Sequence, residues 1–159
     1  MKRMVIFITV AIAGFCLFVC SKPEEMTSVT EYENTEEAEE MENTVKIVIT
    51  SGNNRATAVL DDNSTTRAFI KKLPLTLTMM DLYGRELCYR FDEELPTDNL
   101  RYDGYDIGDI AYWPPGHSFV ILYEQNGEVF ERQHLGHIEN GIEMFDGIGD
   151  TEVTFELAN

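Results

Sequence analysis

Residues 108 to 123 read GDIAYWPPGHSFVILY, and this segment is the strongest indicator of the fold. Two apolar runs flank a corner, residues 113–116, that holds the only tryptophan of the chain, two adjacent prolines and a glycine. Proline fixes its own φ angle and has no N–H, so two prolines in succession end a strand. The segment therefore predicts two strands joined by a tight corner.

Short alternating runs surround this corner on both sides. Alternation of apolar and polar residues is typical of strands with one buried face. It predicts strands at residues 45–49, 56–60, 75–80, 86–91, 119–124, 129–132 and 151–157. Asn126-Gly127 lies between two of these runs and predicts a tight hairpin there. The residues around His134 and His137 predict a strand end or a turn.

One short helix is expected among these strands. Asn63 or Ser64 is a suitable N-cap for a helix over residues 65–72, which Pro74 ends. Some eight strands and one helix with short connections favour a compact barrel over a parallel α/β sheet. The sequence thus predicts a mainly β fold, a closed eight-stranded β-barrel with one or two short helices.

The N-terminus is typical of an exported protein. A positively charged start precedes an uncharged apolar run, residues 4–19. This run is shorter than the roughly 20 residues that span a bilayer, as expected for a secretory signal.

The end of the apolar run, Leu17-Phe18-Val19-Cys20, resembles the lipobox of bacterial lipoproteins, in which the cysteine is lipidated after cleavage. Leu17 fits this pattern, whereas Val19 stands where the family has a small residue. We predict residues 1–20 as a signal peptide and Cys20 as the lipidation site. The protein would then be anchored in the bacterial cell envelope, on the extracytoplasmic side of a membrane.

Two alternatives to lipidation stay open. Cleavage after Ala13 would give a soluble secreted protein, and an uncleaved segment would be a short signal anchor.

Residues 21–43 form a strongly acidic segment with nine glutamates and one lysine. Such a segment buries too little apolar surface to fold and extends by self-repulsion. We predict a disordered tether here and a single folded domain over residues 44–159. The formal net charge of −17 argues against a nucleic-acid partner, because phosphate binding needs a clustered positive surface.

Cys88 is the only cysteine of the predicted domain, since Cys16 and Cys20 belong to the signal. A single cysteine forms no internal disulfide, so the fold depends on its core. Its place in an alternating run predicts a buried, unreactive thiol.

Several ordered motifs together resemble the bacterial cyclophilin-like family. They are the short helix followed by Leu73-Pro74, then Tyr83-Gly84-Arg85-Glu86, Gly108-Asp109-Ile110, Tyr112-Trp113-Pro114-Pro115-Gly116 and Leu135-Gly136-His137-Ile138. The resemblance covers nearly all of residues 45–138. It implies the cyclophilin fold, an eight-stranded barrel with a helix plugging one end, and some members of the family are lipoproteins.

The isomerase motifs of true cyclophilins are missing from this sequence. Cyclophilins place an arginine in a Phe-His-Arg motif and a glutamine in a Gln-Gly-Gly motif, and neither motif occurs here. Catalysed prolyl isomerisation needs a donor aimed at the prolyl nitrogen. Arg85 or Arg90 could supply one, although charge pairing at the surface or across strands is the commoner role of such arginines.

A set of aromatic and polar residues forms the candidate ligand-binding site: Tyr83, Arg85, Tyr89, Tyr112, Trp113, His117 and Phe119. An aromatic groove with a few polar groups suits a peptide or a small ligand. The alternative is that Trp113 and its neighbours merely cover one end of the barrel. No cofactor or metal is expected, because His134 and His137 lack further ligands at a suitable spacing.

Three interpretations of the function remain. The first is an exported, membrane-anchored, cyclophilin-like binding module for a peptide or small ligand, without established catalysis. The second is a divergent peptidyl-prolyl isomerase. The third is a structural protein of the envelope.

Overall fold

The computed structural model describes residues 44–159, which form nine strands and three short helices. The strands are β1 (Val45–Ser51), β2 (Asn54–Leu60), β3 (Leu75–Leu82), β4 (Glu86–Arg90), β5 (Leu100–Asp103), β6 (Asp109–Trp113), β7 (Ser118–Leu122), β8 (Phe130–Asn140) and β9 (Thr151–Leu157). The helices are α1 (Ser64–Ile70) and the 3-10 helices η1 (Pro114–Gly116) and η2 (Ile142–Phe145). The predicted signal peptide, its Cys20 and the acidic tether lie outside the described residues.

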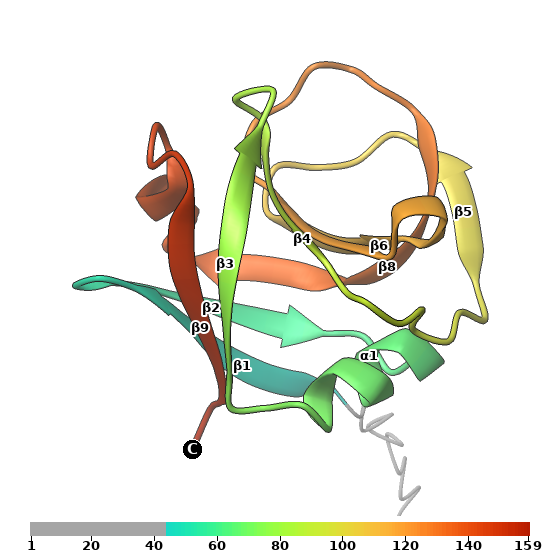
Figure 1. The fold of residues 1–159 in the computed structure, drawn as a ribbon, viewed down its shortest axis with the longest axis horizontal. Coiled ribbons are helices and arrows are strands. Elements are labelled where there is room, and N and C mark those ends of the chain that lie inside the picture. Colours follow the sequence, from blue (N-terminus) through green and yellow to red (C-terminus); the bar gives the residue numbers. More distant parts are fainter. Residues whose placement is uncertain (1–43) are drawn as a thin grey trace, which may run out of the picture. The chain divides into compact units, whose positions relative to one another are not determined.

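Eight of the strands close into an antiparallel barrel (Figure 1). Their order is β2-β1-β9-β3-β4-β7-β6-β8, and pairing between β8 and β2 completes the ring. Strand β5 pairs with the first part of β8 and stands outside the ring. The closed eight-stranded barrel with short helices confirms the predicted fold class. In the part of the chain that the structure describes, no helix is long and apolar enough to cross a membrane.

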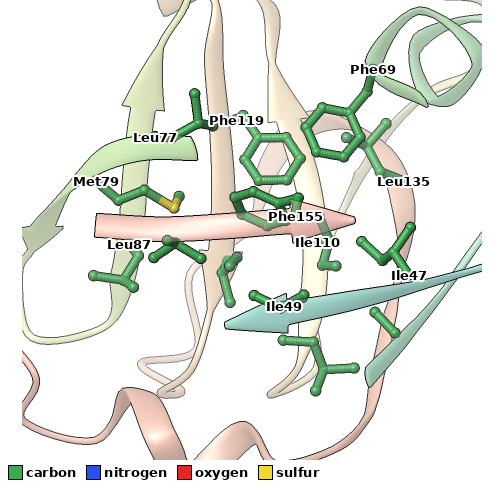
Figure 2. Packing of buried hydrophobic residues seen from close by; sticks show 14 of the residues in the cluster. Ile47, Ile49, Phe69, Leu77, Met79, Leu87, Ile110, Phe119, Leu135 and Phe155 are labelled. Atoms are coloured by element: carbon green, nitrogen blue, oxygen red, sulfur yellow. The ribbon is translucent and has the colours of Figure 1, made fainter. Parts of the chain in front are cut away.

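Helix α1 contributes to the barrel core through Phe69 (Figure 2). The Asn63 side chain accepts a hydrogen bond from the Thr66 N–H at 2.9 Å, so Asn63 is the N-cap. The helix ends at Ile70, two residues before the predicted end. Side chains from β1, β3, β4, β6, β7, β8 and β9 belong to the same interior cluster as Phe69 (Figure 2).

Alternation along β4, β6 and β7 gives this part of the barrel an inner and an outer face. Leu87, Ile121 and Ile110 lie opposite one another across the three strands and belong to the interior cluster. The next residue of each strand points the other way. A second, smaller cluster therefore lies on the outer face and contains Cys88, Tyr105, Ala111, Val120 and Leu122.

The predicted hairpin at Asn126-Gly127 is wrong. Strand β7 pairs with β4 and β6, and β8 pairs with β5, β6 and β2, so β7 and β8 are not partners. The connection between them is instead held by Tyr105, whose hydroxyl oxygen lies 2.9 Å from the Glu124 carbonyl oxygen and 3.1 Å from Asn126 Oδ1, two acceptors that share its one proton. The Asn-Gly pair makes a local turn, but other strands already occupy the edges that a hairpin would use.

The second correction concerns His134 and His137, which lie within β8 and not at a strand end. The β6–β8 register shifts between Ile110 and Ala111. His137 therefore pairs with Asp109 before this shift, and His134 pairs with Ala111 after it. Strand β5 was not predicted. Its four residues alternate between apolar and polar side chains, but the run is too short to stand out from the surrounding loop, and all four are exposed.

Candidate functional site

Three side chains form a row on the outer face of the barrel. Arg90 of β4 pairs with Ser118 of β7, and Ser118 pairs with Trp113 of β6. Residues directly opposite on antiparallel strands share one face of the sheet, so the three side chains project together. Cys88, Val120 and Ala111 form the next row on the same face.

A pocket with a volume of about 280 Å³ lies over these two rows, and we refer to it as the outer pocket. The β3–β4 turn and the start of β8 both contribute to its lining. Its lining residues are Leu82, Tyr83, Arg85, Glu86, Cys88, Arg90, Trp113, Ser118, Val120, Glu128 and Phe130. The outer pocket thus combines aromatic rings, two arginines and two glutamates.

The corner after β6 positions Trp113 at the outer pocket. The indole lies over Gly116, where an ideal Cβ atom would stand 2.6 Å from Trp113 Cζ3. His117 has a φ angle of 48° and its N–H donates to the Pro114 carbonyl, so the chain reverses directly into β7. Ser118 Oγ donates to the Gly116 carbonyl at 3.0 Å. With 38% of its surface exposed, Trp113 faces the outer pocket and also covers the corner.

The tight turn between β3 and β4 positions Arg85. Tyr83 and Gly84 both have positive φ angles, 61° and 57°, and the Arg85 N–H donates to the Leu82 carbonyl at 3.2 Å. Two successive positive φ angles define a turn whose twist matches that of the flanking strands. The Arg85 carbonyl in turn accepts hydrogen bonds from the N–H groups of Tyr123 and Glu124, which ties the β7–β8 connection to this turn.

Arg85 is a buried member of the outer pocket, and it pairs with two glutamates there. Its side chain is only 9% exposed. Nη2 donates to Glu86 Oε2 at 2.7 Å, and Nη1 donates to Glu128. The rings of Tyr83 and Tyr105 lie 5.7 and 5.8 Å from the guanidinium carbon, close enough for cation–π attraction.

Burial and these ion pairs shift the pKa values of three groups that line the outer pocket. Burial raises the pKa of Glu86, and the adjacent Arg85 only partly offsets that effect. The hydrogen bond from Arg85 lowers the pKa of Glu128. Burial also raises the pKa of Cys88, which favours the neutral thiol.

The residues proposed from the sequence divide between the two faces of the barrel. Tyr83, Arg85 and Trp113 line the outer pocket. Tyr112 and Phe119 are fully buried in the interior cluster, and the Tyr112 hydroxyl accepts a hydrogen bond from the Leu95 N–H at 2.9 Å.

The two remaining candidates also lie away from the outer pocket lining. Tyr89 packs against the interior cluster and meets Phe91 edge-on, with ring centroids 5.1 Å apart. His117 helps to form the corner. The predicted aromatic site therefore combined residues from both faces of the barrel. Tyr112 and Trp113, for example, are adjacent in β6 and point to opposite faces.

Sequence reasoning missed several residues of the outer pocket, above all Glu128 and Phe130. Part of the lining could have been found from strand parity, because Cys88 and Arg90 share one face of β4. Glu128 carries no such signal, since it follows a loop whose path depends on tertiary contacts.

A second polar cluster surrounds Asp109, a buried carboxylate at the start of β6. Asp109 Oδ1 lies 3.4 Å from His134 Nε2 and 3.1 Å from His137 Nδ1, while His134 Nδ1 lies 2.6 Å from Asp61 Oδ2. Burial would raise the pKa of Asp109, but hydrogen bonds from His134, the Asp106 N–H and His137 outweigh it and hold that pKa well below its ordinary value. Residues 44–159 contain no group of three or more His, Cys, Asp and Glu side chains arranged to hold a metal ion.

A larger depression of about 510 Å³ lies elsewhere, between Leu73-Pro74 and the last residues of the chain. It is lined by no aromatic side chain, and Arg55 is its one basic residue. The outer pocket is the stronger candidate because aromatic rings and polar groups converge there, the combination typical of ligand sites.

Comparison with known proteins supports the description of the fold. The model of the cyclophilin-like family matches residues 49–156. The solution structure of a hypothetical protein from Archaeoglobus fulgidus is similar, with a TM-score of 0.61 and 21% sequence identity; the match covers 76% of this chain and 99% of that one. This likeness concerns the fold. No curated protein matches the chain.

Proposed function

The chain belongs to the cyclophilin-like family, and from this premise we propose that its domain is a binding module that takes a peptide or a small ligand into the outer pocket. One observation carries the proposal: the outer pocket gathers the single tryptophan of the protein, two further aromatic rings and two arginines over one patch of the barrel. A volume of about 280 Å³ suits one or two side chains of a peptide or a small molecule.

The groups of the outer pocket offer both apolar contact and orientation. Trp113 and Phe130 supply aromatic surface for an apolar group of the ligand. Ser118 and Arg90 stand beside Trp113 in the same row. Arg90 can donate to backbone or side-chain oxygens of the ligand, whereas Ser118 Oγ, which already donates to the Gly116 carbonyl, can accept a hydrogen bond from a ligand N–H. Buried apolar anchors with a few polar partners are the usual basis of peptide recognition.

Binding without established catalysis is the function that these groups support best. Both terminal nitrogens of Arg85 are engaged with glutamates. Arg90 is exposed beside Ser118 and Trp113, and this position is the observation that favours the second candidate, a divergent peptidyl-prolyl isomerase. In that case Arg90 would donate to the prolyl nitrogen of the twisted transition state.

The proposed place of action is the extracytoplasmic side of a bacterial membrane. The support is the charged start, the apolar run of residues 4–19 and the lipobox-like ending at Cys20. Incorporation of a labelled fatty acid into the full chain, compared with Cys20→Ser, tests the anchor. Label in both proteins, or in neither, would contradict lipidation at Cys20.

The binding proposal is tested by a peptide and small-molecule screen followed by ¹⁵N chemical-shift mapping. We expect ligands to shift the amides of Arg90, Trp113 and Ser118 and to leave those of Thr50 and Thr57, in the larger depression, unchanged. Shifts confined to Thr50 and Thr57 would show that the ligand binds in the larger depression and not in the outer pocket. A screen that leaves every amide unchanged would favour the third interpretation, a structural protein of the envelope.

The same ligands separate binding from catalysis. Exchange spectroscopy on proline-containing peptides measures cis–trans interconversion directly. Turnover that Arg90→Gln abolishes and Arg101→Gln preserves would establish the isomerase in place of the binding module; Arg101 is the control because it is an exposed arginine of β5 outside the outer pocket.

A further inference from the structure

Glu128 covers the Arg85 guanidinium at the side of the outer pocket. Its carboxylate accepts a hydrogen bond from Arg85 Nη1, and its side chain is 51% exposed, against 9% for Arg85. Glu86, the other partner of Arg85, is 10% exposed and belongs to β4. One carboxylate on Arg85 is therefore part of the sheet, and the other reaches in from the solvent side.

The guanidinium itself is fixed and still has an unused donor. Tyr83 and Tyr105 hold it by cation–π contacts, and Glu86 holds Nη2. Arg85 Nε is buried and has no hydrogen-bond partner among the described residues. A guanidinium presents its donors in a planar fork that matches a carboxylate, so a rigid arginine with donors to spare is suited to carboxylate recognition.

The backbone of the segment that carries Glu128 is held by hydrogen bonds that do not use the Glu128 carboxylate. The Glu128 N–H donates to the Asn126 side chain at 3.0 Å, and the Gly127 N–H donates to the Gln125 side chain at 2.7 Å. Tyr105 anchors Asn126 in turn. These bonds involve the backbone of the connection, so the Glu128 carboxylate can leave Arg85 by side-chain rotation while the connection keeps its shape.

We infer that Glu128 occupies the position that a carboxylate of the ligand takes on Arg85, so that the outer pocket binds ligands with a carboxylate next to an apolar group, such as a peptide C-terminus. The inference rests on the proposed binding function and names its ligand class. Binding exchanges one carboxylate for another on Arg85, and the Glu128 side chain moves into solvent.

The charges in the outer pocket favour a ligand carboxylate over a cation or a neutral group. A ligand carboxylate restores the charge that Glu128 removes, so Arg85 and Glu86 remain compensated. A ligand cation would displace no group and would meet Arg85 and Arg90. A neutral amide would compete poorly, since charge-assisted hydrogen bonds are about twice as strong as neutral ones. Trp113 and Phe130 line the same pocket and would receive the neighbouring apolar group.

The first experiment uses acetate to replace the Glu128 carboxylate on Arg85. In Glu128→Ala, acetate should raise the melting temperature by about 3 °C over chloride at equal ionic strength, the effect of a weak ligand at several times its Kd. Wild type and the control Glu131→Ala, an exposed glutamate of β8, should show no such difference. Equal responses of the three proteins would overturn the inference. Near-UV circular dichroism shows that each variant is folded.

The second experiment uses N-acetyl-Ala-Leu with a free C-terminus and the same peptide as its amide, followed by Trp113 fluorescence. We expect the acid to bind more tightly than the amide. Glu128→Gln should bind the acid about tenfold more tightly than wild type does, because the competing charge is gone. Equal affinities for acid and amide would overturn the inference and leave the binding function intact.

Arg90 provides the decisive control, because it is the other arginine of the outer pocket. If Arg90→Gln removes the preference for the acid and Glu128→Gln leaves it unchanged, the carboxylate binds to Arg90 and the inference is wrong. If acetate stabilises Glu128→Ala but neither peptide changes Trp113 fluorescence in any variant, the carboxylate exchange on Arg85 stands and the proposed peptide-binding function fails.

Discussion

Phe69 of α1 stacks on Phe119 of β7, with ring centroids 4.6 Å apart and an interplanar angle of 14°. Both rings also meet Phe155 of β9 edge-on, at 5.6 and 5.4 Å. The three rings come from distant parts of the sequence and are almost completely buried. They connect the helix to two strands that are not neighbours in the ring, so α1 is part of the core.

The first prediction is that Phe69→Ala destabilises the domain by about 3–5 kcal/mol, the cost of removing a buried ring and leaving a cavity. Urea unfolding followed by far-UV circular dichroism measures the loss. Arg67→Ala is the matched control, because Arg67 lies on the same helix and forms only an exposed pair with Asp62. Its cost should be within about 0.5 kcal/mol. Equal losses for the two variants would contradict the role assigned to the aromatic cluster.

The second prediction concerns Gly136, where β8 passes close to β2. Its φ angle is 152°, and an ideal Cβ atom would stand 2.2 Å from the Val59 carbonyl oxygen. Backbone atoms cannot yield as a flexible side chain can, so Gly136→Ala should cost about 3 kcal/mol or more and weaken closure of the barrel.

Gly147→Ala separates this steric effect from backbone strain. Gly147 also has a positive φ angle, 62°, but no atom lies within 4 Å of its ideal Cβ position. Its substitution should cost about 1–2 kcal/mol. Hydrogen exchange of the β2 and β8 amides should increase in Gly136→Ala alone; unchanged exchange there would contradict the close approach of the two strands.

The barrel was predictable from the sequence because its signals are local. Asn63 ahead of a short helix, the corner at residues 113–116 and the alternation of β9 are each visible in a few consecutive residues. Strand β5 was missed because its alternating run has only four residues. The Asn126-Gly127 hairpin failed because a turn signal gives no information about which strands finally pair.

The candidate site was predictable only in part. Tyr83, Arg85 and Trp113 lie at turns or at a corner, where unusual residues attract notice. Tyr112 was predicted to share a ligand site with Trp113, but adjacent residues of a strand point to opposite faces, and Tyr112 is buried inside the barrel. The pairing of Glu128 with Arg85 joins residues 43 positions apart and follows from tertiary structure alone.

The third prediction concerns Gly116 and the orientation of Trp113. A methyl group at residue 116 would stand 2.6 and 2.8 Å from two carbons of the indole ring. The ring must therefore move, and at the edge of the outer pocket it can do so at little cost in stability. Gly116→Ala should shift the Trp113 emission maximum and weaken ligand binding several-fold, with a loss of stability of about 1 kcal/mol.

Gly104→Ala is a suitable control for this experiment, because no atom lies within 4 Å of its ideal Cβ position. Emission and binding should stay as in wild type. If Gly116→Ala also keeps the wild-type emission, the indole does not lie over the corner as described.

The fourth prediction is a pH dependence of stability that originates at His134. The hydrogen bond with Asp109, supported by Asp61, raises the pKa of His134 above its ordinary value against the opposing effect of burial. A raised pKa in the folded state means that the folded protein holds this proton more tightly than the unfolded chain does. The stabilisation is complete below about pH 6.5, the ordinary value of histidine, and is lost as the pH rises through the higher pKa of the folded state.

Urea unfolding between about pH 6 and about pH 8 measures this effect, in a range that avoids deprotonation of Cys88 in the unfolded chain. The unfolding midpoint of wild type should fall as the pH rises, and that of His134→Gln should fall less. His117→Gln is the matched control, because His117 lies at the corner, away from Asp61 and Asp109. It should keep the slope of wild type. Parallel slopes for wild type and His134→Gln would show that the contacts of His134 with Asp61 and Asp109 do not govern the pH response.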